Sequence, residues 1–205
     1  MDVLLFPLVN VTLFPKTTKP LNIFEPRYIE MIHTSIDTNT PIALGFIETP
    51  TTVHPVVSGH PVNFVRKIAG FGRAQIIETR ANGTLLVFIN GEGKCRLGVA
   101  KNDHRSFITC EAEVIPEQIV VEASLVSQVS MLNKILARWI TMHIPDPVQR
   151  DFFLEHLKGP EEVVGAFASY LVKDHDLQQM VLEFDTLKEK IEFLGRLALS
   201  GEVTV

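Results

Sequence analysis

The pattern of apolar residues changes abruptly at Pro116. Before it, short apolar runs rich in Val, Ile and Phe are separated by Gly, Pro and Asn-Gly pairs, which is typical of strands and turns. After it, apolar residues recur at helical spacing and proline stands mainly at element boundaries. The sequence therefore predicts an α+β chain, with a small β-barrel over residues 1–116 followed by an α-helical bundle over residues 117–205.

Two extended segments and one helix are predicted in the first part of the chain. Val3 to Leu8 is an apolar run ended by turn residues, and Leu21 to Phe24 is a second extended piece. Pro26 begins the helix, because proline has no backbone donor to lose at a first helical position. Apolar side chains continue it at helical spacing: Tyr28, Ile29, Ile32 and Ile36.

A buried strand and a surface loop are predicted after this helix. Pro41 to Glu48 is the apolar run of the strand. Thr49 to Pro61 contains three prolines, which predicts an extended loop.

The β-rich region continues from residue 62 to residue 115. Asn82-Gly83 and Asn90-Gly91 predict two hairpin turns, because both residue types tolerate positive φ. Gly70-Phe71-Gly72 predicts a bulge or a tight bend where backbones pass closely. The expected strands are Val62–Val65, Ala74–Thr79, Thr84–Ile89, Lys94–Val99 and a half-buried Ser106–Ile115. So many short strands favour a closed or half-closed barrel, since closure removes exposed strand edges.

Helix start and stop signals divide the second part. A long helix carries one apolar face made of Leu125, Val129, Leu132, Leu136, Trp139 and Ile140. Asp146-Pro147 predicts the next start, as an N-cap followed by proline at the first helical position. Gly159-Pro160 predicts another start, and Asp185 is expected to cap the last helix. An all-α bundle follows from these signals.

Net charge, apolar runs and cysteine content indicate which classes of protein the chain can belong to. The 205 residues carry a formal net charge of −5, which argues against wholesale binding of nucleic acid or of an anionic membrane. The N-terminus has no basic region of a signal peptide, and no apolar run is long enough to span a membrane, so a cytoplasmic protein is expected. Cys95 and Cys110 are expected as reduced, buried thiols, with a disulfide or a metal pair as the alternative.

The sequence contains no complete catalytic or cofactor-binding motif. Gly91 to Cys95 lacks the first glycine and the hydroxyl of a phosphate-binding loop, and Gly70-x-Gly72 lacks the third glycine of a dinucleotide site. His54 and His60 share a loop but form no metal-ligand motif, and Asp174-His175-Asp176 has no nucleophile to act on. The sequence therefore predicts a non-enzyme with no cofactor and no metal.

The stretch Pro20 to Tyr28, PLNIFEPRY, follows an apolar strand and a Phe-Pro turn. In this order it resembles the opening of the Lon protease N-terminal domain, and Leu177 to Asp185 is similar to a helix junction of that family. The resemblance implies a barrel related to the PUA fold followed by a helical bundle. Lys16 stands where the family commonly has glycine, and Lys190 where it commonly has arginine.

The resemblance also implies a function. It predicts a stand-alone, non-catalytic module that binds unfolded, damaged or apolar polypeptide segments, with a separate ATP-dependent protease as a candidate partner. The residues expected to contact substrate are Phe14, Pro15, Phe24, Arg27, Tyr28 and Phe71. The alternative is structural: phenylalanines are usually buried, and Tyr28 could pack under the first helix while Arg27 pairs with Glu25 or Glu30.

A second function class comes from the basic residues of the β-rich part. PUA-like barrels often bind RNA, and such binding would weaken steeply with salt. The basic side chains are Arg66, Lys67, Arg73, Arg80, Lys94, Arg96, Lys101 and Arg105, interspersed with Glu78, Glu92 and Asp103. Because the charges are mixed, nucleic acid is the less favoured partner. Self-association through the apolar C-terminal helices stays open, as monomer and dimer fit the pattern equally.

Overall fold

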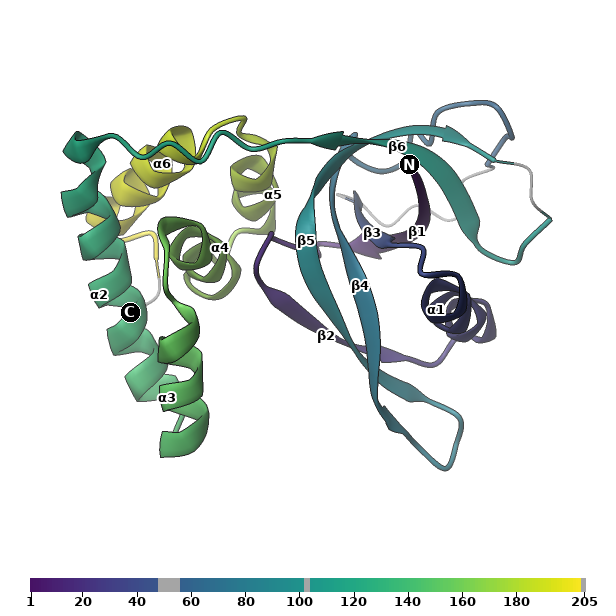
Figure 1. Cartoon of the computed structure of the whole chain (residues 1–205), viewed down its shortest axis with the longest axis horizontal. Coiled ribbons are helices and arrows are strands. Elements are labelled where there is room, and N and C mark those ends of the chain that lie inside the picture. The colour runs from purple at the N-terminus through teal and green to yellow at the C-terminus, as the bar shows by residue number, and fades with distance from the viewer. Residues whose placement is uncertain (48–55, 102–103, 204–205) are drawn as a thin grey trace. The chain divides into compact units, whose positions relative to one another are not determined.

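The computed structural model describes residues 1–47, 56–101 and 104–203. The chain divides into two compact units, Met1–Pro116 and Glu117–Val205 (Figure 1). We call them the β unit and the helical unit and describe each by itself. The class is α+β, as predicted from the change of pattern at Pro116.

Among the described residues, five strands of the β unit pair in a closed ring, and a further strand, β2, is attached to it through β5. The elements of the unit are β1 (Asp2–Val9), β2 (Thr18–Ile23), α1 (Pro26–Thr38), β3 (Ile42–Ile47), β4 (Ile68–Thr79), β5 (Leu85–Ala100) and β6 (Ile108–Ile115). The sheet order is β2-β5-β4-β3-β1-β6, and an additional pairing between β5 and β6 closes the ring. β1 and β3 are parallel, and the other pairs are antiparallel. The parallel pair requires a crossover, which β2 and α1 provide.

Both faces of β1 are buried, each against a different apolar cluster. Val3 and Leu5 belong to one cluster with Cys95 and Cys110. The residues between and after them, Leu4 and Phe6, belong to a second cluster with Met31 and Ile32 of α1. Side chains alternate between the two faces of a strand, so the continuous apolar run of β1 serves both clusters. The position of α1 against the sheet follows from the second cluster (Figure 1).

The prediction that Asn90-Gly91 ends a strand was wrong. β5 is one strand of 16 residues that runs through this dipeptide. Its first half pairs with β2 and its second half with β6, while β4 follows both halves. Glycine is needed at position 91 because a Cβ there would lie 2.1 Å from the carbonyl oxygen of Phe14. The other pair, Asn82-Gly83, does form the predicted turn, with Gly83 at φ 80°.

The bulge in β4 and the segment Val62–Val65 were both predicted from the sequence, and only the bulge is present. The bulge at Gly70-Phe71-Gly72 is confirmed, because the register of β4 with β5 shifts between Phe71 and Gly72. The predicted strand Val62–Val65 is wrong, since this segment forms a turn. Val62 and Val65 are nevertheless buried in the cluster of Cys95 and Cys110. The apolar run there reflects burial of a turn rather than pairing of a strand.

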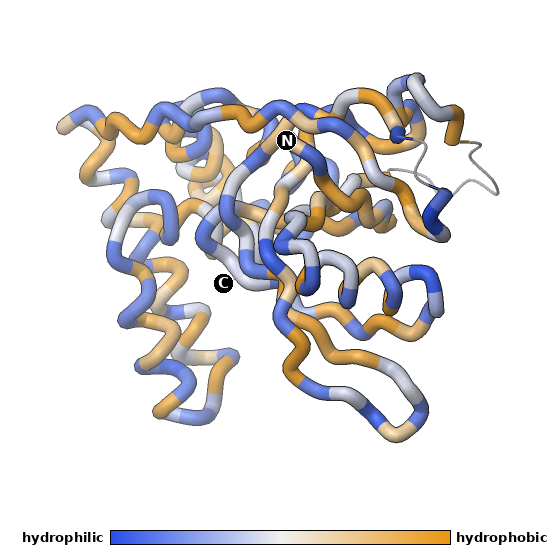
Figure 2. Tube along the Cα trace, turned by 45° about the vertical axis from the view of Figure 1, so that its right-hand side comes forward, coloured by the Kyte–Doolittle hydropathy of each residue, from blue (hydrophilic) through white to orange (hydrophobic). Residues whose placement is uncertain are grey.

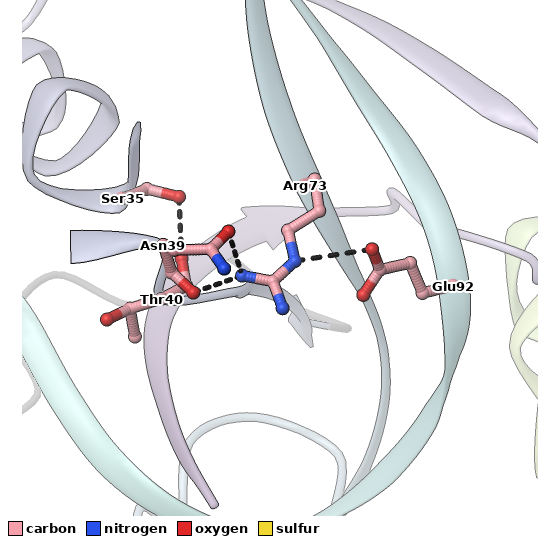
Figure 3. A network of polar contacts seen from close by, with 5 residues as sticks. All are labelled: Ser35, Asn39, Thr40, Arg73 and Glu92. Carbon is pink, nitrogen blue, oxygen red and sulfur yellow. Dashed lines mark hydrogen bonds and ion pairs between the residues drawn. The ribbon is translucent and has the colours of Figure 1, made fainter. Parts of the chain in front are cut away.

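A polar network anchors the end of α1 to the sheet (Figure 3). Arg73 of β4 donates to the carbonyl oxygen of Asn39 and, at 2.9 Å, to its side-chain oxygen. Its Nε lies 3.2 Å from a carboxylate oxygen of Glu92 on β5. Ser35 donates to the carbonyl oxygen of Thr40 at 2.7 Å, which closes the last turn of the helix. These bonds give partners to the carbonyls of Asn39 and Thr40, directly after the helix, and hold the end of α1 against the sheet.

The helical unit contains five α-helices and one short 3₁₀ turn among the described residues. They are η1 (Ala123–Leu125), α2 (Val126–His143), α3 (Pro147–His156), α4 (Pro160–Leu171), α5 (His175–Glu183) and α6 (Leu187–Ser200). Hydrophobic and hydrophilic residues alternate along them, as amphipathic helices require (Figure 2). Asp146 caps α3 as predicted. The predicted cap Asp185 was wrong by one residue, because Thr186 forms a capping box with Glu189.

The turn between β1 and β2 contains a strained residue. Lys16 has φ 61°, and with Pro15 before it the turn has the pattern of type II, which favours glycine at this position. We expect Lys16→Gly to stabilise the protein by roughly 0.5–1 kcal/mol, since removing about 1–2 kcal/mol of left-handed strain outweighs the added freedom of the unfolded chain. Urea unfolding followed by circular dichroism measures this change. Lys16→Ala keeps the Cβ, so equal stability of the Gly and Ala variants would contradict the prediction.

Candidate functional site

A pocket of about 600 Å³ lies in the β unit, where β1 and β6 diverge. β6 pairs with β1 only as far as the Leu5–Ile108 pair, and the pocket begins there. Its walls come from β1, from the end of β2 and the start of α1, from the segment that enters β6, and from three further apolar side chains. They are residues 5–8, 22–25, 27–28 and 106–108, together with Ile47, Val56 and Phe64. It lies where residues of both apolar clusters meet.

Phe24 and the first turn of α1 form one side of the pocket. Phe24 is 71 % exposed, immediately before the helix, although it is a large apolar residue. Glu25 precedes Pro26 at the helix start and accepts an ion pair from Arg27 at 2.8 Å. The Arg27 guanidinium also lies over the ring of Tyr28, 4.5 Å from its centre. The structural role expected for Arg27, pairing with Glu25, is therefore present together with its place beside the pocket.

Tyr28 connects this rim to the core. Its ring packs against that of Phe6, with 4.3 Å between the ring centres. Burial raises the pKa of Tyr28, while the nearby Arg27 lowers it and Glu25 raises it. The hydroxyl therefore stays protonated at neutral pH. Because Glu25 and Arg27 offset each other, this side of the pocket suits an apolar group better than an ion.

The structure brings three of the six expected binding residues together. Phe24, Arg27 and Tyr28 all line the pocket. Phe14 and Phe71 are 1 % and 7 % exposed, so their side chains lie in the interior and present no surface to a partner. Their burial follows the usual preference of phenylalanine. Pro15 is half-buried in the turn before β2 and does not line the pocket.

Several residues of the pocket were not singled out from the sequence. The sequence places Leu8 and Phe64 in strands and Phe107 at the start of the last strand, and all three line the pocket. Ser106 donates to a carboxylate oxygen of Glu30 at 2.6 Å, which joins the start of β6 to α1. The signal that could have pointed to them is weak: each stands at the end of an apolar run, where a strand leaves its partner. Only the pairing of β1 and β6 identifies the opening.

The described residues offer no metal-binding cluster of three or more His, Cys, Asp or Glu side chains. His54 lies outside the described residues, as does most of the predicted loop Thr49–Pro61, while His60 is exposed. Cys95 and Cys110 are free and buried. Burial raises the pKa of each thiol to about 12, so neither is a nucleophile near neutral pH.

Ion pairs offset much of the basic character of the β unit. Arg80 lies 3.6 Å from Glu78, Arg96 lies 3.9 Å from Glu113, and Lys101 lies 2.7 Å from Asp2. Arg73 is held by Glu92 in the network at the end of α1. Lys94 is only 1 % exposed. A phosphate backbone would compete with carboxylates for these side chains, which weakens the case for RNA.

No helix in residues 1–47, 56–101 and 104–203 has the length and apolar character needed to cross a membrane.

Comparison with known proteins gives consistent results. The family profile described as the ATP-dependent protease La (LON) substrate-binding domain matches residues 2–198. Among solved structures, a Lon N-terminal domain protein from Xanthomonas campestris superposes with a TM-score of 0.67 at 16 % identity, covering 95 % of this chain and 96 % of that one. The N-terminal domain of the Mycobacterium avium complex Lon protease gives 0.66 at 13 % identity, with 98 % and 99 % covered. Among curated proteins, none matches significantly.

Proposed function

Because the chain belongs to the ATP-dependent protease La (LON) substrate-binding domain family, we propose that it recognises unfolded or apolar polypeptide segments through the pocket beside Phe24. The observation that carries the proposal is the exposed Phe24 ring at an apolar pocket of about 600 Å³. An exposed aromatic beside a concave apolar surface marks an interaction site. The proposal assigns the chain no catalytic step, and delivery of the bound segment to an ATP-dependent protease is its further part.

The size of the pocket sets the expected affinity. Burying one large apolar side chain contributes about 1.5–3 kcal/mol. A dissociation constant of 1 mM corresponds to about 4 kcal/mol, so one or two side chains yield weak binding in the high micromolar to millimolar range. Weak binding with little selectivity suits a module that must release many different segments.

The test uses a reduced and alkylated globular protein as a permanently unfolded ligand. Fluorescence anisotropy should show saturable binding that changes little with salt, since apolar contacts carry it. Phe24→Ala should weaken binding about tenfold, the equivalent of roughly 1.4 kcal/mol of lost apolar contact. The matched control is Phe152→Ala, because Phe152 is also largely exposed, at 64 %, but does not line the pocket.

Two results would contradict the proposal. One is the absence of saturable binding up to low millimolar concentration, and the other is equal affinity of the Phe24→Ala and Phe152→Ala variants. Recovery of RNA from a lysate, lost steeply as salt rises, would favour the nucleic-acid alternative instead. Recovery of an ATP-dependent protease together with unfolded proteins, insensitive to salt, would support the part of the proposal that concerns delivery.

A further inference from the structure

The strand β1 has an open edge inside the pocket. On one side, β1 pairs with β3 along Leu4 to Val9. On the other side it pairs with β6, but only from Asp2 to Leu5. Within the described parts of the chain no strand pairs with this second side beyond Leu5. Of the residues at this open edge, Phe6, Pro7 and Leu8 line the pocket, and Val9 follows directly after them in β1.

The hydrogen bonds of β1 show which backbone groups face the open edge. The N–H of Leu4 donates to Pro41 at 2.9 Å, and the N–H of Asn10 donates to Ile47 at 3.2 Å, both toward β3. Because backbone groups alternate along a strand, Pro7 and Val9 point theirs the opposite way. The open edge therefore presents the carbonyls of Pro7 and Val9 and the N–H of Val9. Proline has no N–H, which limits uncontrolled pairing at such an edge.

We propose that the pocket binds a polypeptide segment in extended form, as a short strand that pairs antiparallel with Pro7 and Val9. The segment takes the position beside β1 that β6 occupies only as far as Leu5. The inference deepens the proposed function and rests on it. It commits to one occupant, an unfolded segment with free backbone N–H groups, because the edge offers backbone groups and not only apolar area.

The pairing determines the preferred residue pattern of the segment. The residues opposite Pro7 and Val9 donate their N–H groups to the two carbonyls, and the residue between them lies opposite Leu8. Its side chain stands on the same face as those of Phe6 and Leu8, which pack with Tyr28. The preferred segment thus has a large apolar residue in the centre, and neither neighbour is proline.

The peptide-side test uses a seven-residue peptide with a central phenylalanine and threonine elsewhere, so that one side chain determines the register. N-methylation of the two residues that flank the phenylalanine removes both donors and should weaken binding about tenfold or more, as each hydrogen bond is worth roughly a factor of 2–13. N-methylation of the phenylalanine itself should change binding less than threefold, because its N–H points away from β1. Equal effects of the two modifications, or the reverse order, would overturn the proposal.

The protein-side test replaces Val9. Val9→Pro removes the single N–H donor of the open edge, and extended edge strands tolerate proline. It should weaken binding of the unmodified peptide about 3- to 10-fold. Val9→Ala keeps the donor and should bind within threefold of the wild type. If Val9→Pro does not fold, as judged by circular dichroism, the peptide series alone decides.

The two levels of the proposal fail in different ways. If the peptide binds and Phe24→Ala weakens it, but both N-methylated peptides bind equally, segments enter the pocket without strand pairing. In that case the inference is wrong and the proposed function stands. If no peptide binds at concentrations up to the low millimolar range, both are wrong.

Discussion

Lys190→Met is expected to destabilise the helical unit by roughly 3–5 kcal/mol, because it leaves a buried carboxylate without its cation. The Nζ of Lys190 lies 2.8 Å from the carboxylate of Glu117, and the two side chains are only 2 % and 12 % exposed. The pair joins the first residue of the unit to α6. Trp139 is the single tryptophan of the chain and belongs to α2, so its fluorescence during urea unfolding reports on this unit.

The neighbouring ion pair is the control. Lys188 lies 2.9 Å from Glu122, but both side chains are exposed, at 43 % and 56 %. Lys188→Met should therefore leave the unfolding midpoint almost unchanged. The double variant Glu117→Leu with Lys190→Met should regain most of the loss, since no charge then remains buried. Equal effects of the two lysine substitutions would show that burial does not determine the contribution of this pair.

Gly70→Ala should be among the most damaging small substitutions in the β unit, at about 3 kcal/mol or more. A Cβ at position 70 would lie 1.9 Å from the carbonyl oxygen of Leu13. Both clashing groups are fixed to the backbone of packed segments, so no side-chain rotation relieves the contact. Thermal unfolding followed by circular dichroism, with hydrogen exchange of the β4 amides, measures the loss. This contact agrees with the prediction from the sequence that backbones pass closely at Gly70-Phe71-Gly72.

Gly83→Ala separates steric clash from backbone strain. Gly83 also requires glycine-like backbone, at φ 80°, but nothing lies within 4 Å of its added Cβ. The cost there should be only about 1 kcal/mol. If Gly70→Ala and Gly83→Ala cost the same, the segment containing Leu13 must move aside more easily than its packing indicates.

Strand pairing explains why the candidate site was only half predictable. The stretch Phe24 to Tyr28 stood out in the sequence as the start of a helix after an apolar turn, and all of its residues except Pro26 line the pocket. The opposite wall, formed by Leu8 and Phe107, depends on where β6 stops pairing with β1. Those strands are about a hundred residues apart in the chain, and no local pattern marks the end of their ladder.

Local rules accounted for the elements whose causes lie within a few residues. Pro26 begins α1, Asp146 caps α3, and Asn82-Gly83 turns the β4–β5 hairpin, because proline geometry, side-chain capping and tolerance of positive φ act on the nearest backbone. The change of pattern at Pro116 likewise predicted the α+β class. These features were readable from the sequence by itself.

Some sequence patterns occur twice in the chain but have different structures, and only tertiary contacts determine which structure each one adopts. Asn90-Gly91 has the same dipeptide as the true turn but continues β5, because its glycine makes room for the carbonyl of Phe14. Phe14 and Phe24 both stand beside turns, yet one is 1 % and the other 71 % exposed. Burial and strand pairing depend on contacts between segments that are distant in the sequence. The free energy of these contacts is gained only when the chain has folded. For that reason the sequence predicted the family and the elements, whereas only the folded chain showed the pocket and its open strand edge.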